Sequence, residues 1–323
     1  MGTRKDFLLN KIIKNFITVI ICALLSFVVY FALLSIFGSK TPIKNTQQQT
    51  NNSEVKKQIK KKKKVNLFAL GDSLTQGVGD STNNGGYVYL IQQKLQKEYT
   101  HLKVLTNNFG KSGDRSDQIL ARLQESKEMQ KELKSADIIV LTVGGNDLMQ
   151  TLQKNFNSLS SDELAKVMPS AKKTYAYKLN NLLQSIRIYN ANAPVFIFEI
   201  YNPFFVYFPR LTQLQKYTNE WNNTTRQVII KKKGMHLVQI NKQLSEGQYI
   251  GKTAQLKTTT VTDLNSLDGN KLAAIVSNKK EKNDYLSAYD HFHPNLKGYN
   301  YMTEQLYKKM INYKNSWLNK VNK

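Results

Sequence analysis

Short apolar runs alternate along the chain with longer stretches in which apolar residues recur every three or four positions. The runs predict five strands, at residues 65–70, 102–109, 137–143, 195–200 and 235–240. The longer spacing predicts helices at residues 87–95, 117–133, 148–189 with a break at Pro169, 211–230 and 296–311. Strands that alternate with helices of this length are typical of parallel βαβ units with right-handed crossovers. The pattern therefore predicts an α/β domain built around a parallel sheet.

A longer apolar stretch lies near the N-terminus, where the 22 residues from Phe16 to Phe37 include no charged side chain. A helix of this length, at ~1.5 Å per residue, spans the hydrocarbon core of a bilayer. We therefore expect a transmembrane helix at residues 16–38, after a cytoplasmic N-terminus at residues 1–15. A cleaved signal peptide is the alternative, but the stretch is long for one and no A-x-A-like site follows it. The one cysteine, Cys22, lies inside this stretch, so no intramolecular disulfide or thiolate metal cluster can form.

A polar, lysine-rich segment follows at residues 39–64 and is poor in apolar side chains. Such a composition cannot bury enough apolar surface to fold, so it predicts a flexible stalk. Residues 1–64 carry 13 Lys and Arg against 2 Asp and Glu, which is +11 of the chain's formal +24. The lysines could contact anionic lipid headgroups or an anionic wall polymer, or form only a solvated charge run. The neighbouring membrane span disfavours nucleic acid as a partner.

Basic residues on both sides of the apolar stretch set its expected orientation. Four precede the stretch, and Lys40 and Lys44 follow it closely. Counted within ~15 residues of the span, they keep the N-terminus inside the cell. A long following domain is translocated largely regardless of its charges. We therefore expect a single-pass protein of the cell membrane, with residues 65–323 forming an extracellular domain.

Candidate chemistry begins at the end of the first strand, where an apolar run stops at Gly71 and is followed by Asp72 and Ser73. In open α/β sheets, sites lie at the carboxyl ends of the strands. Ser73 is therefore a candidate nucleophile, and Asp72 is expected to fix the turn that aims it. The alternative is that Asp72 or Ser73 only caps the next helix.

Two further stretches follow predicted strands. Gly110 and Gly113 lie in the stretch 108–113, where glycines let the backbone turn and present amide groups to an anion. Asn146 lies in the stretch 144–147, and its side-chain amide can donate to a developing oxyanion. Each stretch taken alone is equally compatible with a plain turn.

A fourth stretch, Asp290-His291-Phe292-His293-Pro294, precedes the last helix. An imidazole can take the proton of a serine when a carboxylate holds it in the right tautomer. Asp290 and His293 are three residues apart, which lets the carboxylate reach the ring nitrogen that faces away from the serine. His291 lacks this reach and is interpreted as a neighbour. A metal site at Asp290, His291 and His293 is the alternative, but no other His or Cys cluster completes a coordination sphere.

Taken in order, these four stretches resemble the four sequence blocks of the SGNH/GDSL esterase and lipase superfamily. The resemblance covers residues 65–313 and rests on the order of the blocks, since each block alone is weak. It implies a three-layer α/β/α, flavodoxin-like fold with five parallel strands, and neither cofactor nor metal. The Gly-x-Ser-x-Gly motif of α/β-hydrolases is not matched, because Thr75 stands at the last glycine position.

The resemblance also implies hydrolysis of an ester through an acyl-serine intermediate. Ser73 would be the nucleophile, His293 the general base and then acid, and Asp290 its orienter. The oxyanion hole would use the backbone amides of Ser73 and Gly110 and the side chain of Asn146.

The substrate stays open, because the same catalytic set serves lysophospholipids, short acyl esters, thioesters and acetylated sugars. Among superfamily members the chain looks like the membrane-tethered, lysophospholipase-like bacterial ones. A peptidoglycan or wall-polymer O-acyl esterase is the second hypothesis, and a non-catalytic module that binds an anionic surface polymer is the alternative of another class. The aromatic residues 201–209 would form an acyl-chain wall, a loop that meets lipid, or ordinary core. Residues 244–288 match no block and could carry a substrate wall of their own.

Overall fold

The computed structural model of the protein describes residues 61–155, 162–254, 256 and 280–319. Their centre is one sheet of five parallel strands in the order β2-β1-β3-β4-β5. The strands are β1 (Lys64–Gly71), β2 (Lys103–Gly110), β3 (Ile138–Leu141), β4 (Val195–Phe198) and β5 (Met235–Val238). Each strand coincides with one of the five apolar runs, so the predicted parallel α/β sheet is confirmed.

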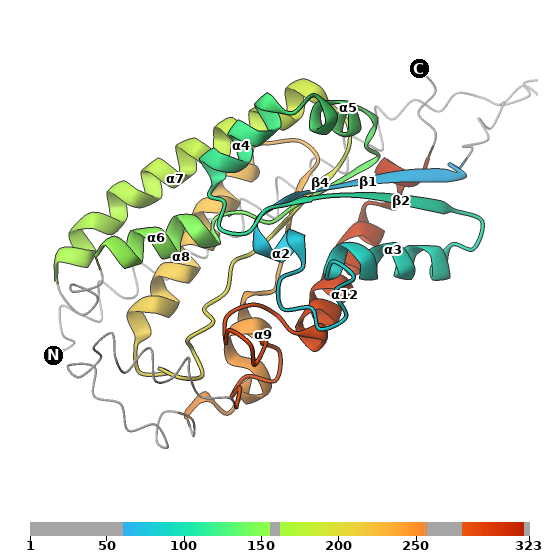
Figure 1. Ribbon diagram of the computed structural model, residues 1–323. Helices are drawn as coiled ribbons and strands as arrows, with labels where there is room; N and C mark the ends of the chain where they lie inside the picture. The colour runs from blue at the N-terminus through green and yellow to red at the C-terminus, as the bar shows by residue number, and fades with distance from the viewer. Residues whose placement is uncertain (1–60, 156–161, 255, 257–279, 320–323) are drawn as a thin grey trace, which may run out of the picture. The chain divides into compact units, whose positions relative to one another are not determined.

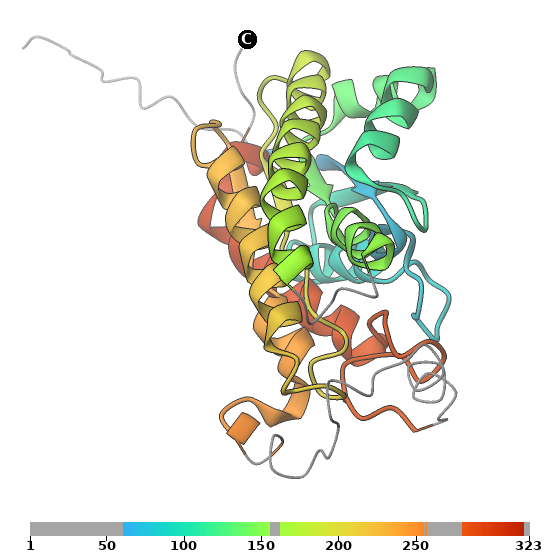
Figure 2. The same ribbon diagram turned by 90° about the vertical axis from the view of Figure 1, so that its left-hand side faces the viewer.

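Helices cover both faces of the sheet and make three layers (Figure 1). One face carries α4 (Ser116–Glu125), α5 (Lys127–Ser135), α6 (Gly145–Lys154), α7 (Asp162–Tyr189) and α8 (Thr212–Ile229). The other face carries α3 (Tyr87–Glu98), α9 (Asn241–Glu246), α12 (Leu296–Asn312) and α13 (Lys314–Leu318). The short α2 (Ser73–Gln76) follows β1, and a 3₁₀ turn, η2 (Gly247–Tyr249), follows α9. In Figure 2, α7 and α8 run side by side on the first face.

Strand β1 lies inside the sheet and is covered on both faces. Phe68 and Leu70 pack on the side of α4 and α7, whereas Leu67 and Ala69 pack on the side of α3 and α12. Alternate strand residues point to opposite faces, so a strand covered on both sides is apolar at every position. The chain runs from β1 to β2 on one side and then crosses to β3 on the other. The carboxyl ends of β1 and β3 therefore flank the crevice where such sheets bind ligands.

Two helical regions differ from their predicted form. The helix expected at residues 117–133 is two helices, because Ser126 ends α4 and its hydroxyl accepts from the Met129 N–H at 3.2 Å to begin α5. The break expected at Pro169 does not occur, and α7 continues through it. A proline inside a helix costs roughly 3 kcal/mol, but each large apolar side chain that α7 buries contributes about 1.5–3 kcal/mol. The buried side chains of α7 include Leu164, Met168, Tyr175, Leu179, Leu182, Leu183 and Ile186.

The folded domain begins a few residues before the predicted boundary at residue 65. The Lys62 N–H donates to the Leu318 carbonyl at 2.8 Å, and Lys62 Nζ pairs with Asp137 at 2.5 Å. The last lysines of the predicted stalk therefore belong to the domain. The transmembrane helix predicted at residues 16–38 and the rest of the stalk lie outside the described residues. Within the described ranges, no helix has the length and apolar character that crossing a bilayer requires.

Candidate active site

The turn after β1 holds Ser73 at the carboxyl edge of the sheet. A Cβ at Gly71 would lie 2.3 Å from Thr142 Oγ1, so the glycine is what lets β1 and the end of β3 approach this closely. Asp72 is the N-cap of α2, and its Oδ1 accepts from the Leu74 N–H at 3.0 Å and from Thr142 Oγ1 at 2.7 Å. Asp72 therefore fixes the turn, as the sequence predicted.

A buried chain of hydroxyl groups continues from Asp72 into the core. Thr75 Oγ1 lies 2.7 Å from Thr142 Oγ1 and 2.8 Å from the Tyr87 hydroxyl. Burial raises the pKa of Asp72, and the hydrogen bonds from Thr142 and Leu74 offset this only in part. These bonds join β1, β3 and α3 behind the nucleophile and hold its turn in one arrangement.

Ser73, His293 and Asp290 contact one another, although they are far apart in the sequence. His293 Nε2 lies 2.7 Å from Ser73 Oγ, and His293 Nδ1 lies 2.5 Å from Asp290 Oδ2. A proton on Nδ1 that is donated to the carboxylate leaves Nε2 as the acceptor for the serine proton. The arrangement is therefore able to activate the serine hydroxyl.

The second carboxylate oxygen of Asp290 fixes the backbone of its own loop. Asp290 Oδ1 accepts from the N–H groups of Phe292 and His293, both at 3.0 Å. Burial raises the pKa of Asp290, but hydrogen bonds from the His293 side chain and from the two backbone amides outweigh it, so the pKa lies below its ordinary value. The carboxylate is therefore ionised at neutral pH and can stabilise an imidazolium at His293.

Asn146 lies at the start of α6, and it lines the same cavity as Ser73. One hydrogen of its side-chain amide is donated to the Asp114 carbonyl at 2.9 Å. The amide carries a second hydrogen, which is left for a ligand in the cavity. The structure thus places Asn146 near Ser73, which in turn contacts the pair formed by His293 and Asp290.

Gly110 is placed differently from its predicted role. Its N–H donates to Asn108 Oδ1 at 3.0 Å, so this amide is already engaged. A Cβ at Gly110 would lie 2.0 Å from the Gln76 nitrogen, so the glycine is needed for the close approach of β2 to α2. Gly113 has a left-handed φ of +85°, and its N–H donates to no group within the described part of the chain. Of these two glycine amides, only that of Gly113 has no acceptor among the described residues, and it precedes Asp114, whose carbonyl accepts from Asn146.

Arg122, which the sequence analysis did not identify as a site residue, links the ends of β1 and β2 to Asp114. Arg122, in α4, donates from Nη2 to the Gly71 carbonyl at 3.0 Å and from Nη1 to the Phe109 carbonyl at 3.1 Å. Its Nε donates to Asp114 Oδ2 at 2.5 Å. An arginine on a helix has the sequence signature of a solvated surface charge, so only the tertiary contacts identify this role.

A cavity of about 40 Å³ opens beside Ser73. The aromatic segment at residues 201–209 contributes to it only at its start, because Tyr207 and Phe208 are buried in the core. The Tyr201 hydroxyl donates to the Phe292 carbonyl at 2.6 Å, which joins the two aromatic walls of the cavity. The cavity is lined by Asp72, Ser73, Leu74, Thr142, Val143, Gly145, Asn146, Phe198, Glu199, Ile200, Tyr201 and Phe292.

His291 points away from the serine, since its ring contacts Tyr207 and Glu281 rather than the catalytic groups. His291 and His293 therefore face different partners and do not converge with Asp290 on one point. Among the described residues, no cluster of three or more potential metal ligands occurs.

The sequence matches the GDSL-like lipase/acylhydrolase family over residues 69–301, which is most of the chain. The chain therefore belongs to this family and is a hydrolase of carboxylic esters. The superfamily resemblance drawn from the four blocks is confirmed.

Individual relatives agree with this assignment. The chain is 28% identical over 250 residues to the uncharacterized protein YpmR of Bacillus subtilis, covering 77% of this chain and 83% of that protein. It is 29% identical over 160 residues to the spore germination lipase LipC of Bacillus licheniformis, covering 50% of this chain and 73% of that protein. The crystal structure of the lipase Lip_vut3 from a goat rumen metagenome has the same fold, with a TM-score of 0.55 and 24% identity over 76% of this chain and 97% of that chain.

Proposed function

We propose that the protein hydrolyses its ester substrate through an acyl-serine intermediate formed on Ser73. The observation that carries the proposal is the unbroken series of contacts from Ser73 Oγ to His293 and from His293 to Asp290. Ser73 Oγ attacks the ester carbonyl while His293 Nε2 takes its proton. The imidazolium then gives that proton to the departing alcohol. In the second half of the reaction, His293 Nε2 takes a proton from the water that attacks the acyl group and gives it back to Ser73 Oγ as the acid leaves.

The negative charge that develops on the carbonyl oxygen needs donors that are already in place. The N–H of Ser73, like that of Gly113, donates to no other group in the described ranges, and the Asn146 amide has a hydrogen to spare. We assign the oxyanion hole to Ser73, Asn146 and Gly113, with Gly113 replacing Gly110. A single donor of this kind contributes about 10²- to 10³-fold to kcat.

The decisive experiment measures release of p-nitrophenol from p-nitrophenyl acetate by the purified protein. Ser73→Ala should abolish turnover and also labelling by a fluorophosphonate, which forms a covalent bond with an activated serine. Ser81→Ala, which changes an exposed serine a few residues away, is the matched control and should keep both. Full activity in Ser73→Ala would refute this nucleophile. No turnover and no labelling in the unaltered protein would instead favour the non-catalytic binding module.

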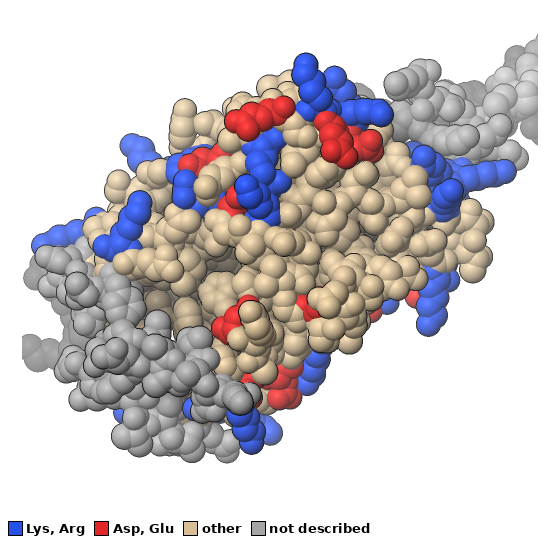
Figure 3. All heavy atoms as spheres, viewed as in Figure 1, with Lys and Arg blue, Asp and Glu red and all other residues tan. Residues whose placement is uncertain are grey.

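The size of the cavity supports a short acyl group. Roughly 10–15 Å³ of such space holds one water molecule, so about 40 Å³ accommodates a group of only a few heavy atoms. In the orientation of Figure 1, the surface directly over α2 shows few charged side chains (Figure 3). The cavity size favours a short O-acyl ester, such as one on a wall polymer or peptidoglycan, over the long acyl chain of a lysophospholipid.

A series of p-nitrophenyl esters tests the acyl length. The acetate and propionate should be the best substrates, and esters longer than butyrate should lose kcat/KM progressively. Phe292→Ala should move the optimum to longer chains, because Phe292 forms one wall of the cavity. Preference for lysophosphatidylcholine over acetylated glycan would restore the lysophospholipase hypothesis.

We also propose that the domain works outside the cell, attached to the membrane by the apolar residues 16–38. This rests on the sequence, where charge-free residues precede a basic, polar segment. Protease added to intact cells should release the domain by cutting within residues 39–60. Complete protection of the domain would place it inside the cell.

A further inference from the structure

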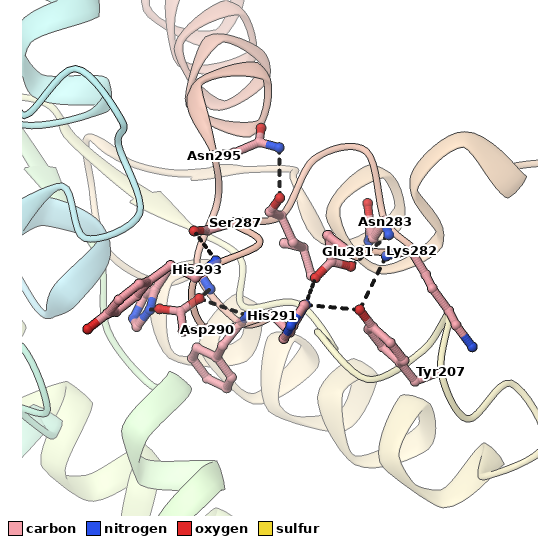
Figure 4. Close-up of polar contacts among 12 residues, drawn as sticks. Tyr207, Glu281, Lys282, Asn283, Ser287, Asp290, His291, His293 and Asn295 are labelled. Carbon is pink, nitrogen blue, oxygen red and sulfur yellow. Dashed lines mark hydrogen bonds and ion pairs between the residues drawn. The ribbon is translucent and has the colours of Figure 1, made fainter. Parts of the chain in front are cut away.

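A second buried polar cluster lies between the loop that carries Asp290 and His293 and a neighbouring segment, and is made of Tyr207, Glu281 and His291 (Figure 4). His291 is only 3% exposed, and the Glu281 side chain is 8% exposed. His291 Nδ1 contacts a Glu281 carboxylate oxygen directly and lies 3.1 Å from the Tyr207 hydroxyl. A Glu side chain is almost never buried unless it is paired, and the pair formed here takes no part in the proposed ester chemistry.

The cluster joins two segments that have no regular secondary structure of their own. Tyr207 belongs to the segment between β4 and α8, and Glu281 and His291 belong to the segment before α12. The Lys282 N–H donates to the Tyr207 hydroxyl at 3.2 Å, and the same hydroxyl lies 3.1 Å from His291 Nδ1. The buried contacts thus fasten the catalytic loop to the rest of the domain at a point two residues before His293.

The backbone at His291, beside these contacts, has an unusual conformation. The His291 N–H donates to the Ser287 carbonyl at 2.8 Å, and the turn ends at His291 with a left-handed φ of +56°. This conformation is unfavourable for a residue other than glycine, and it persists where surrounding contacts enforce it. Directly after the turn, the amides of Phe292 and His293 bond to Asp290 Oδ1. A change of backbone at His291 would therefore move His293 relative to Ser73.

We propose that Glu281 and Tyr207 are positioning residues that act through His291 to hold His293 Nε2 on Ser73, an inference that rests on the proposed catalytic role of His293. The Glu281 carboxylate accepts from His291 Nδ1 and so fixes both the ring and the left-handed turn. Neither Glu281 nor His291 touches the substrate in this scheme.

Substitutions at Glu281 test the proposal in the full-length protein. Glu281→Ala should lower kcat for p-nitrophenyl acetate by about 10²-fold, the effect of displacing a catalytic group by roughly 1 Å, with KM within about twofold of its original value. Glu281→Gln should restore most of the loss, because its amide oxygen still accepts from His291 Nδ1. The rate of fluorophosphonate labelling of Ser73 should fall by the same factor as kcat. Glu304→Ala, which removes a more exposed carboxylate paired with Lys94, is the control and should leave kcat unchanged.

A double-variant comparison separates positioning from general stability. His291→Asn can keep the left-handed backbone but is too short to reach Glu281. It should lower kcat about as much as Glu281→Ala does, and the two together should cost no more than either alone. A loss in melting temperature alone, with kcat and the labelling rate unchanged, would overturn the proposal.

The outcomes stay separable from a failure of the proposed function. If the unaltered protein neither turns over esters nor becomes labelled at Ser73, the proposed function fails. If it does both while Glu281→Ala keeps full kcat, only the positioning role fails. Should Glu281→Ala not fold, His291→Asn and Tyr207→Phe decide the question. Both should lower kcat, and kcat unchanged in both would contradict the proposal.

Discussion

Asp72 and Asp290 lie on two sides of the same serine, and the protein treats their carboxyl groups in opposite ways. Asp72 is 4% exposed, and burial raises its pKa. Asp290 is also partly buried, but the hydrogen bonds from His293 bring its pKa below the ordinary value. The aspartate next to Ser73 in the sequence therefore holds a turn, whereas the distant one holds His293, the proposed base. Environment, rather than closeness in the sequence, decides which carboxylate can support the proposed chemistry.

Substitutions of Asp290 and Asp72 should differ most in their effect on kcat. Asp290→Asn should lower kcat about 10⁴-fold, because an amide in this position favours the wrong tautomer of the histidine. Asp72→Asn should cost less than about tenfold, since the amide oxygen can still accept from Leu74 and Thr142. Steady-state kinetics with p-nitrophenyl acetate measures both. Equal losses of kcat in the two variants would contradict the different roles given to Asp290 and Asp72.

The next difference is in stability. Asp72→Ala removes an N-cap worth about 1 kcal/mol and leaves the buried Thr142 hydroxyl without its acceptor, which costs about 1–3 kcal/mol more. We expect the free energy of unfolding to fall by about 2–4 kcal/mol in urea titrations. Asp290→Ala should lose less, because its carboxylate is more exposed. A larger loss for Asp290→Ala would show that its loop, rather than the Ser73 turn, is the main support of this edge.

The smallest difference is in the pH dependence of stability. Asp72 keeps its proton to higher pH in the folded protein than in the unfolded chain, so it lowers the free energy of unfolding as the pH rises above 3.8. Ionised Asp290 stabilises the folded protein above pH 3.8, and this contribution is lost as the pH falls through the lowered pKa of Asp290.

Urea titrations at about pH 3 and about pH 7 should therefore separate the two neutral variants. Relative to the unaltered protein, Asp72→Asn should become more stable on going to the higher pH, and Asp290→Asn less stable. Parallel pH profiles would contradict the opposite pKa directions.

Most of the architecture could be predicted from local patterns. The inner strands β1, β3 and β4 are covered on both faces and are visible as apolar runs, and the edge strands β2 and β5 keep enough apolar residues to be visible as well. Helix boundaries were harder, because Ser126 divides one apolar pattern into two helices and Pro169 does not divide another. In the first case a single hydroxyl cap decides the boundary. In the second, the buried face of α7 outweighs the local cost of the proline.

Part of the candidate site could also be predicted from local sequence, and part could not. Ser73, Asn146, Asp290 and His293 stand in short motifs, and the structure places them together. Gly110 and Gly113 fit one glycine pattern equally well, and only the hydrogen bond to Asn108 and the contact with α2 distinguish them. The partnership of Glu281 with His291 and Tyr207 joins irregular segments across the fold, so no periodicity in the sequence could have predicted it.

The bond between Lys62 and Leu318 has a consequence for how the enzyme meets its surroundings. The chain enters the domain at the amino edge of the sheet, and Ser73 lies at the far end of β1. Eight strand residues at ~3.3 Å each separate these two points by about 26 Å. A linkage at either described end, whether a natural tether or an affinity tag, therefore leaves the mouth of the cavity unobstructed.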